Sequence, residues 1–96
     1  MNKHEITFKQ YKCILKKLKY RNDRIAIELV NAKNGEPVLT ATVNIPDEAL
    51  GADEVIIKNY SENEGVLRVL INASIISFPI RYANDNDGMP VCKLLI

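Results

Sequence analysis

Residues 53–77, DEVIIKNYSENEGVLRVLINASIIS, constrain the fold more than any other part of the chain. The β-branched run at 55–57 is typical of a strand, and Ser61 followed by Glu64 has the spacing of a helix capping box. The next apolar residues recur at helical spacing: Val66, Leu67, Val69, Leu70, Ala73 and Ile76. The pattern predicts a strand followed by a helix at about 61–76, with Ser61 as its N-cap and Ile76 in its last turn. Because such a helix is marginal alone in water, its apolar face needs a sheet to cover.

Two alternating segments, 24–30 and 38–45, predict the clearest hairpin of that sheet. Opposed residues of a hairpin share a face, so the register must bring apolar residues opposite apolar residues. A two-residue turn at Asn34 and Gly35 would place leucine and isoleucine opposite threonines. A three-residue loop from Lys33 to Gly35 avoids this mismatch and puts Gly35 at a left-handed position. The predicted pairs are Leu29 with Leu39, Ile27 with Ala41, and Ile25 with Val43, and Pro37 lies beside the turn.

The segment at 6–20 has two interpretations. Apolar residues at 8, 11, 15 and 18 follow helical spacing, whereas alternate positions give a mixed strand pattern. The compact turn sequence at 21–23 leads directly into the strand at 24–30, which favours strands here too. The helix interpretation stays open from the sequence alone.

Turns and a final strand account for the rest of the chain. Residues 46–52 form an acidic connection, Pro79 ends the helical pattern, and 80–82 predict a short extended piece. The sequence at 84–88, NDNDG, has turn chemistry. The apolar segment 91–96 predicts a last strand inside the sheet, since an exposed tail of this kind would promote aggregation.

A chain of 96 residues, 47% of them hydrophobic, is long enough for one core and too short for two, so a single domain over 1–96 is expected. The longest uncharged stretch, 69–80, is too short and too polar to span a bilayer. The first ten residues lack the pattern of a signal peptide, so a cytoplasmic location and no membrane partner are expected. Cys13 and Cys92 are expected to be free thiols in that compartment.

No catalytic, cofactor or metal site is predicted. A zinc site needs about four ligands in paired spacing, and the cysteine and histidine candidates are only His4, Cys13 and Cys92. The acidic turn at 84–88 superficially resembles a calcium loop, but Ala83 and Leu94 occupy the positions where carboxylates are required. The four glycines are isolated, which excludes a phosphate-binding Gly-rich loop.

Charge is unevenly distributed along the chain. Residues 1–24 carry eight Lys/Arg against two acidic residues, whereas 25–96 carry five against ten. Such an asymmetry is compatible with a basic nucleic-acid surface, with contact between the two halves, or with an edge strand protected by lysines. For the nucleic-acid alternative the candidate residues are Lys12, Lys16, Lys17, Lys19, Arg21 and Arg24.

Three segments carry a family resemblance: NDRIAIELVNAKNGEPVLTATVNIPD, DEVIIKNYSENEGVLRVLINASII and PVCKLLI. They resemble a family of small uncharacterised proteins, a domain of unknown function found on conjugative and other mobile elements of gut anaerobic bacteria. The resemblance runs from Tyr20 to the C-terminus and is most specific at GEP (35–37), TATVN (40–44) and YSENEG (60–65). It implies an accessory role in transfer, regulation or counter-defence, and it carries over no catalytic residue. The N-terminus departs from the pattern.

These observations together predict an α+β domain. It has one mainly antiparallel sheet of about five strands, chiefly a meander, with the 61–76 helix packed on one face. The expected function is a non-enzymatic interaction module that binds a protein partner or itself. The alternative is a nucleic-acid-binding accessory protein that uses the basic N-terminal third.

Overall fold

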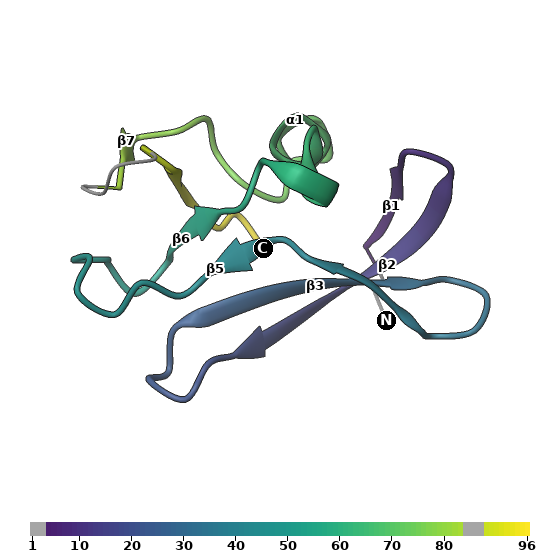
Figure 1. Ribbon diagram of the computed structural model, residues 1–96, viewed down its shortest axis with the longest axis horizontal. Helices are drawn as coiled ribbons and strands as arrows, with labels where there is room; N and C mark the ends of the chain where they lie inside the picture. Colours follow the sequence, from purple (N-terminus) through teal and green to yellow (C-terminus); the bar gives the residue numbers. More distant parts are fainter. Residues whose placement is uncertain (1–3, 84–87) are drawn as a thin grey trace.

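The computed structural model describes residues 4–83 and 88–96 and has two antiparallel sheets and one short helix (Figure 1). The first sheet has the order β1-β2-β3-β4 and the second β5-β6-β8-β7. The strands of the first sheet are β1 (Glu5–Phe8), β2 (Tyr11–Lys19), β3 (Ile25–Asn31) and β4 (Pro37–Thr40). Those of the second are β5 (Thr42–Val43), β6 (Glu54–Ile57), β7 (Arg81–Tyr82) and β8 (Pro90–Lys93). A 3-10 turn, η1 (Ser61–Asn63), precedes the helix α1 (Val66–Asn72).

The prediction of a single sheet of about five strands is wrong, because the chain changes sheets at Ala41. The Ala41 N–H donates to the Ile27 carbonyl in the first sheet, and the Ala41 carbonyl accepts from the Lys58 N–H beyond the end of β6. The Thr42 hydroxyl then accepts the N–H of Ile27, so a side chain replaces the next backbone bond of the ladder. Thr42 and Val43 pair with β6 instead. The predicted strand at 38–45 is therefore split, and the expected pair of Ile25 with Val43 does not form.

The β3–β4 hairpin confirms the predicted register near its turn but not the loop length. Leu29 lies opposite Leu39, and Gly35 has the expected positive φ of 75°. The Gly35 N–H donates to the Asn31 carbonyl, and the Asn31 N–H donates to the Glu36 carbonyl, which makes a loop of residues 32–35. The extra loop residue is offset by a register shift between Leu29 and Val30. The hairpin therefore keeps Leu29 opposite Leu39 at the expense of an irregular register beyond this pair. Pro37 begins β4 beside the turn, as expected.

The strand interpretation of the N-terminal segment is confirmed. Cys13 and Leu15 are buried on one face of β2, whereas Leu18, which the helical spacing would bury, is 46% exposed. The predicted turn after β2 is present as well, with the Tyr20 N–H donating to the Arg24 carbonyl. Asp23, in this turn, has a positive φ of 68°.

The helix is shorter than predicted and has a different cap. Its N-cap is Gly65, with φ 97°, and Ser61 makes no capping bond because it begins η1 with a positive φ of its own, 55°. The Asn59 side-chain oxygen accepts the N–H groups of Gly65 and Leu67, at 3.1 Å and 3.0 Å, so Asn59 supplies the cap. After Asn72 the chain leaves the helix, and the two isoleucines at 75–76 enter the core outside it.

This cap gives a direct test. Replacing Asn59 with alanine is expected to lower the free energy of unfolding by about 1 kcal/mol, because two N–H groups at the helix start lose their acceptor. Replacing Ser61 with alanine should change it by less than about 0.5 kcal/mol, since Ser61 makes no capping bond. Urea denaturation of both variants checks the prediction. A larger loss of unfolding free energy for Ser61→Ala than for Asn59→Ala would show that Ser61, and not Asn59, caps the helix.

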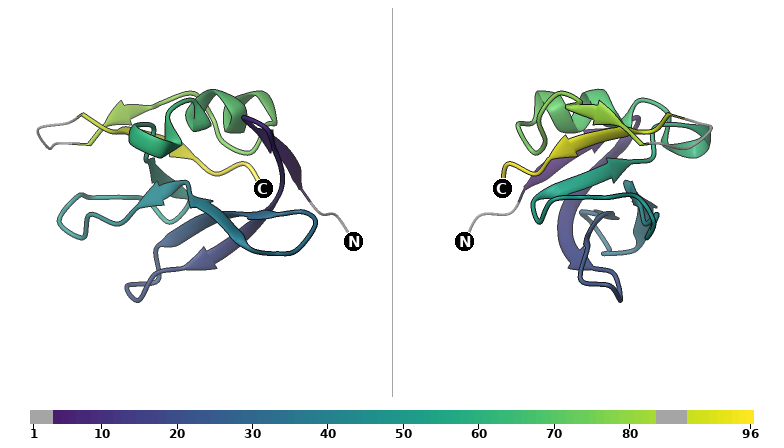
Figure 2. Two further views of the ribbon diagram at one scale, coloured as in Figure 1. Left: turned by 45° about the vertical axis from the view of Figure 1, so that its right-hand side comes forward. Right: turned by 90° about the vertical axis from the view of Figure 1, so that its left-hand side faces the viewer.

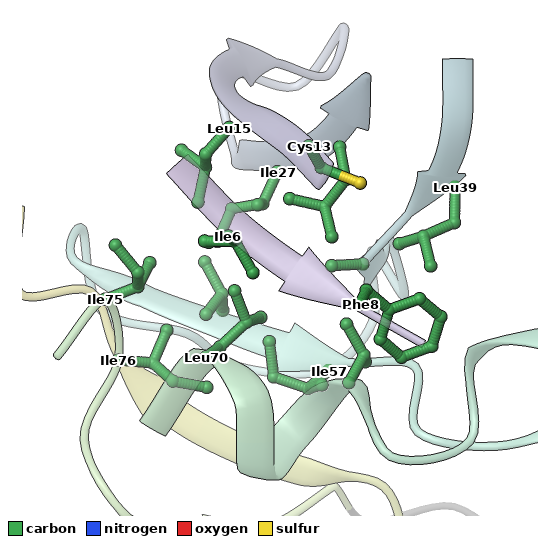
Figure 3. Packing of buried hydrophobic residues seen from close by; sticks show 14 of the residues in the cluster. Ile6, Phe8, Cys13, Leu15, Ile27, Leu39, Ile57, Leu70, Ile75 and Ile76 are labelled. Atoms are coloured by element: carbon green, nitrogen blue, oxygen red, sulfur yellow. The ribbon is translucent and has the colours of Figure 1, made fainter. Parts of the chain in front are cut away.

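The core lies between the two sheets and beneath α1. Figure 3 shows side chains of β1 and β2 facing Leu70 of the helix, Ile57 of β6 and the isoleucines at 75–76. Figure 2 shows α1 alongside β1, and Val66 and Leu70 of the helix belong to the core cluster that both sheets line. A smaller apolar cluster on the other face of the second sheet contains Ile56, Ala83, Met89 and Val91. The helix therefore packs on a core that both sheets line, rather than on one face of a single sheet.

Two further expectations concern the end of the chain, and the first is confirmed. Residues 81–82 form the short strand β7. A last strand is present as β8, which lies between β6 and β7, but it ends at Lys93, and Leu95 and Ile96 are exposed instead of lying inside the sheet. Leu94 continues β8 through an isolated bridge to Ile76. Most of the turn expected at 84–88 lies outside the described residues.

Candidate interaction surfaces

The structure divides the six basic candidate residues among different surroundings. Lys12 and Lys16 lie on one face of β2, and Lys17 and Lys19 lie on the opposite face, because successive strand residues alternate. Arg21 belongs to the exposed β2–β3 turn. The six residues therefore do not form one continuous patch.

Arg24 has a structural role, because its side chain binds backbone carbonyls of another segment. Its guanidinium donates to the carbonyl of Ile45 at 2.6 Å and to the carbonyls of Pro46 and Glu48. These bonds hold the start of β3 against the connection that follows β5. The Arg24 side chain is therefore a structural cation, and its planar guanidinium suits this convergence of acceptors better than an ammonium would.

Two further contacts join the β2–β3 turn to the segment that Arg24 binds. The Tyr20 hydroxyl lies 2.8 Å from the Thr42 hydroxyl, and the Asn22 amide donates to the Asn44 side-chain oxygen at 3.1 Å. The turn is thus held against the chain at 42–48.

A partly apolar groove lies between α1 and β7. It encloses about 540 Å³ and is lined by the apolar residues Leu67, Ile71, Phe78, Pro79 and Tyr82. Phe78 is 74% exposed and Tyr82 is 60% exposed. Glu64 and Arg68 also line this groove, and neither makes an ion pair within residues 4–83 and 88–96. The groove therefore combines two exposed aromatic rings with one free charge of each sign.

The position of β7 is set from its other side. Arg81 forms an ion pair with Glu54 at 2.8 Å and donates to the Ala49 carbonyl. The bond from Arg81 lowers the pKa of the Glu54 carboxyl. Because neighbouring strand residues point to opposite faces, these contacts leave the Tyr82 ring on the groove side.

Sequence reasoning missed this groove. A helix extending to residue 76 would continue past the point where the chain now turns towards Phe78, whereas α1 ends at Asn72 and leaves the rings of Phe78 and Tyr82 beside it. The available signal was the apolar and aromatic residues Phe78, Ile80 and Tyr82, which follow the predicted helix and were not assigned to the core.

The residues considered for chemistry lie apart or buried. Cys13 and Cys92 are free thiols, as expected, and both are buried. Burial raises the pKa of the Cys13 thiol and raises that of Cys92 to about 11, which suppresses the nucleophilic thiolate at neutral pH. Across residues 4–83 and 88–96, no group of three or more His, Cys, Asp or Glu residues could hold a metal ion. In the same ranges no helix has the length and apolarity needed to cross a membrane.

Comparison of this chain with protein-family models, with curated proteins and with solved structures finds no match. The resemblance to the mobile-element family therefore stays a prediction, and the surfaces must be interpreted from their own chemistry.

Proposed function

We propose that this chain is a small, non-enzymatic interaction module that binds an extended segment of a partner protein in the α1–β7 groove. The single observation that supports the proposal is the exposure of Phe78 and Tyr82 beside a partly apolar helix face. Aromatic residues are enriched at protein interfaces, and tyrosine is enriched among the few residues that carry most of the binding energy. A contiguous exposed apolar surface on a small domain marks an interaction site more often than chance exposure.

The charges beside the groove define the chemistry of the partner segment. Arg68 lies between the apolar residues of α1 and has no ion-pair partner in the part of the chain that the structure describes. A guanidinium in that position favours a carboxylate on the bound segment. The proposed partner segment therefore carries apolar or aromatic side chains for the groove and an acidic residue within reach of Arg68.

An accessory role on a mobile genetic element and a cytoplasmic location belong to the same proposal, and both rest on the sequence. A small module that contributes binding rather than chemistry fits an accessory role. The shape and composition of the groove support the binding function, and the accessory role and the location rest on the sequence.

The experiment is peptide selection followed by titration. Random peptides displayed on phage are selected against the full chain, and a selected peptide is titrated calorimetrically into the wild type and into Phe78→Ser/Tyr82→Ser. We expect selected peptides to pair an acidic residue with apolar ones, and the double variant to bind at least about 30-fold more weakly. Leu18→Ser, at another exposed apolar residue, is the matched control and should bind like the wild type.

Three results would contradict the proposal. One is that no peptide binds better than about 1 mM, the weak end of specific recognition. Another is that selected peptides bind the double variant as tightly as the wild type. The third is that sedimentation shows a dimer that Phe78→Ser/Tyr82→Ser abolishes, because the groove would then hold a second copy of this chain.

A further inference from the structure

We propose that the second half of β2 and the following turn form a basic edge, made of Lys16, Lys17, Lys19 and Arg21, that binds the phosphate backbone of duplex nucleic acid. This inference is independent of the groove. Figure 2 places the β2–β3 turn at the opposite end of the molecule from α1 and β7. The two proposals can therefore be tested independently of each other.

The pairing of the strands exposes this edge. β1 pairs with β2 as far as Ile14, and the Leu15 N–H then donates to the His4 carbonyl. Within the described residues, the segment 16–19 pairs only with β3. Its three lysines and Arg21 are exposed, and across residues 4–83 and 88–96 their side chains form no ion pair or hydrogen bond.

The lysine charges are largely uncompensated. Lys17 and Lys19 lie opposite Ile27 and Ile25, so the neighbouring strand offers them no carboxylate. Lys16 lies opposite Glu28, without an ion pair. Unpaired cations clustered at an edge attract a polyanion, and binding then releases condensed counterions.

The placement of the lysines on both faces of one strand favours a duplex over a single strand. Lys16 points to one face, and Lys17 and Lys19 point to the other. The major groove is about 12 Å wide and admits a two-stranded ribbon between its two phosphate rows. An edge that enters this groove can place Lys16 against one row and Lys17 and Lys19 against the other. A single strand has only one phosphate row, so it does not offer a second row at this fixed spacing.

The contacts of Tyr20, Asn22 and Arg24 order the hairpin before any ligand binds. They join the turn to residues 42–48 and use none of the four basic side chains of the edge. An edge already held in place loses less conformational entropy on binding than a mobile basic loop would. This is the role that the structure gives Arg24, in place of the direct phosphate contact considered from the sequence.

The test is fluorescence anisotropy with a labelled duplex of about 20 base pairs, long enough for backbone binding, at salt concentrations from about 50 to 200 mM. Four phosphate contacts predict a slope of about −3.6 for log K against log salt, which is about a 150-fold loss over that range. Lys17→Gln/Lys19→Gln should halve the slope and weaken binding at the lowest salt on the order of 100-fold. Lys33→Gln/Lys93→Gln removes the same charge elsewhere and should keep the wild-type slope.

Several outcomes would overturn the inference. The control double variant could lose as much affinity as Lys17→Gln/Lys19→Gln, which would show that duplex binding depends on net charge and not on this edge. The single strand of the same sequence could bind as tightly as the duplex, which would show that contact with two phosphate rows is not needed. Phosphatidylserine vesicles could bind more tightly than the duplex, which would assign the edge to an anionic membrane. Phe78→Ser/Tyr82→Ser should leave duplex binding unchanged, so failure of the groove proposal would not affect this one.

Discussion

Replacing Leu70 with alanine is expected to lower the free energy of unfolding by about 3 kcal/mol, within the range of about 2–5 kcal/mol for buried leucines. Leu70 is completely buried where α1 meets both sheets (Figure 3). Removal of its side chain loses apolar burial and leaves a cavity in the core cluster that contains residues of both sheets and of the helix. For a domain of this size such a loss is a large part of the total stability.

The matched control is Leu67→Ala, the same substitution one turn earlier on the groove side. Leu67 is partly buried and lines the groove, so its loss should cost about 1 kcal/mol, less than that of a core leucine. Urea denaturation with a shared m-value compares the two variants. Equal losses would mean that α1 does not turn Leu70 into the core and Leu67 towards the groove.

Replacing Arg24 with glutamine should lower the free energy of unfolding by about 2–3 kcal/mol. The guanidinium donates to three backbone carbonyls, and hydrogen bonds to charged groups contribute about 1.5–3 kcal/mol when partly buried. Glutamine cannot reach all three acceptors, so at least one carbonyl loses its donor. The start of β3 would also separate more easily from residues 45–48.

Arg24→Lys is the control that separates charge from geometry. Lysine keeps the positive charge but lacks the planar fork of donors, so we expect it to recover less than half of the loss. Arg21→Gln, on the exposed turn, should change stability by less than about 0.5 kcal/mol. Thermal unfolding of the three variants checks this order. A full rescue by lysine would show that charge, rather than convergent hydrogen bonding, is what the fold requires at Arg24.

Local patterns in the sequence were sufficient to predict most of the elements. Alternation at 24–30 predicted β3, the turn at 21–23 correctly favoured a strand before it, and the apolar C-terminus indicated β8. Opposition of Leu29 to Leu39 followed from burial alone, because a slipped register would have exposed one of them. Each of these features depends on residues near in sequence or on a single facing strand.

The helix shows where local reasoning fails. Ser61 and Glu64 match a capping box, yet Asn59 provides the acceptor and the helix begins only at Val66. The isoleucines at 75–76 continued the helical spacing, but they are buried outside the helix, next to the C-terminal residues. The apolar spacing correctly indicated that these two isoleucines are buried, but it did not indicate that they lie outside the helix.

The sequence by itself determined where most strands run and which residues of the β3–β4 hairpin face the core, because alternation and turn chemistry act over a few residues. Only the tertiary structure decided that the chain changes sheets at Ala41, that Arg24 serves the fold, and that α1 stops early enough to leave a groove beside Tyr82. Those outcomes depend on contacts between segments far apart in the chain: the Thr42 hydroxyl on Ile27, three carbonyls on one guanidinium, and β8 drawing residues 75–82 away from the helix. No local pattern encodes such contacts, since their free energy exists only when both layers are assembled.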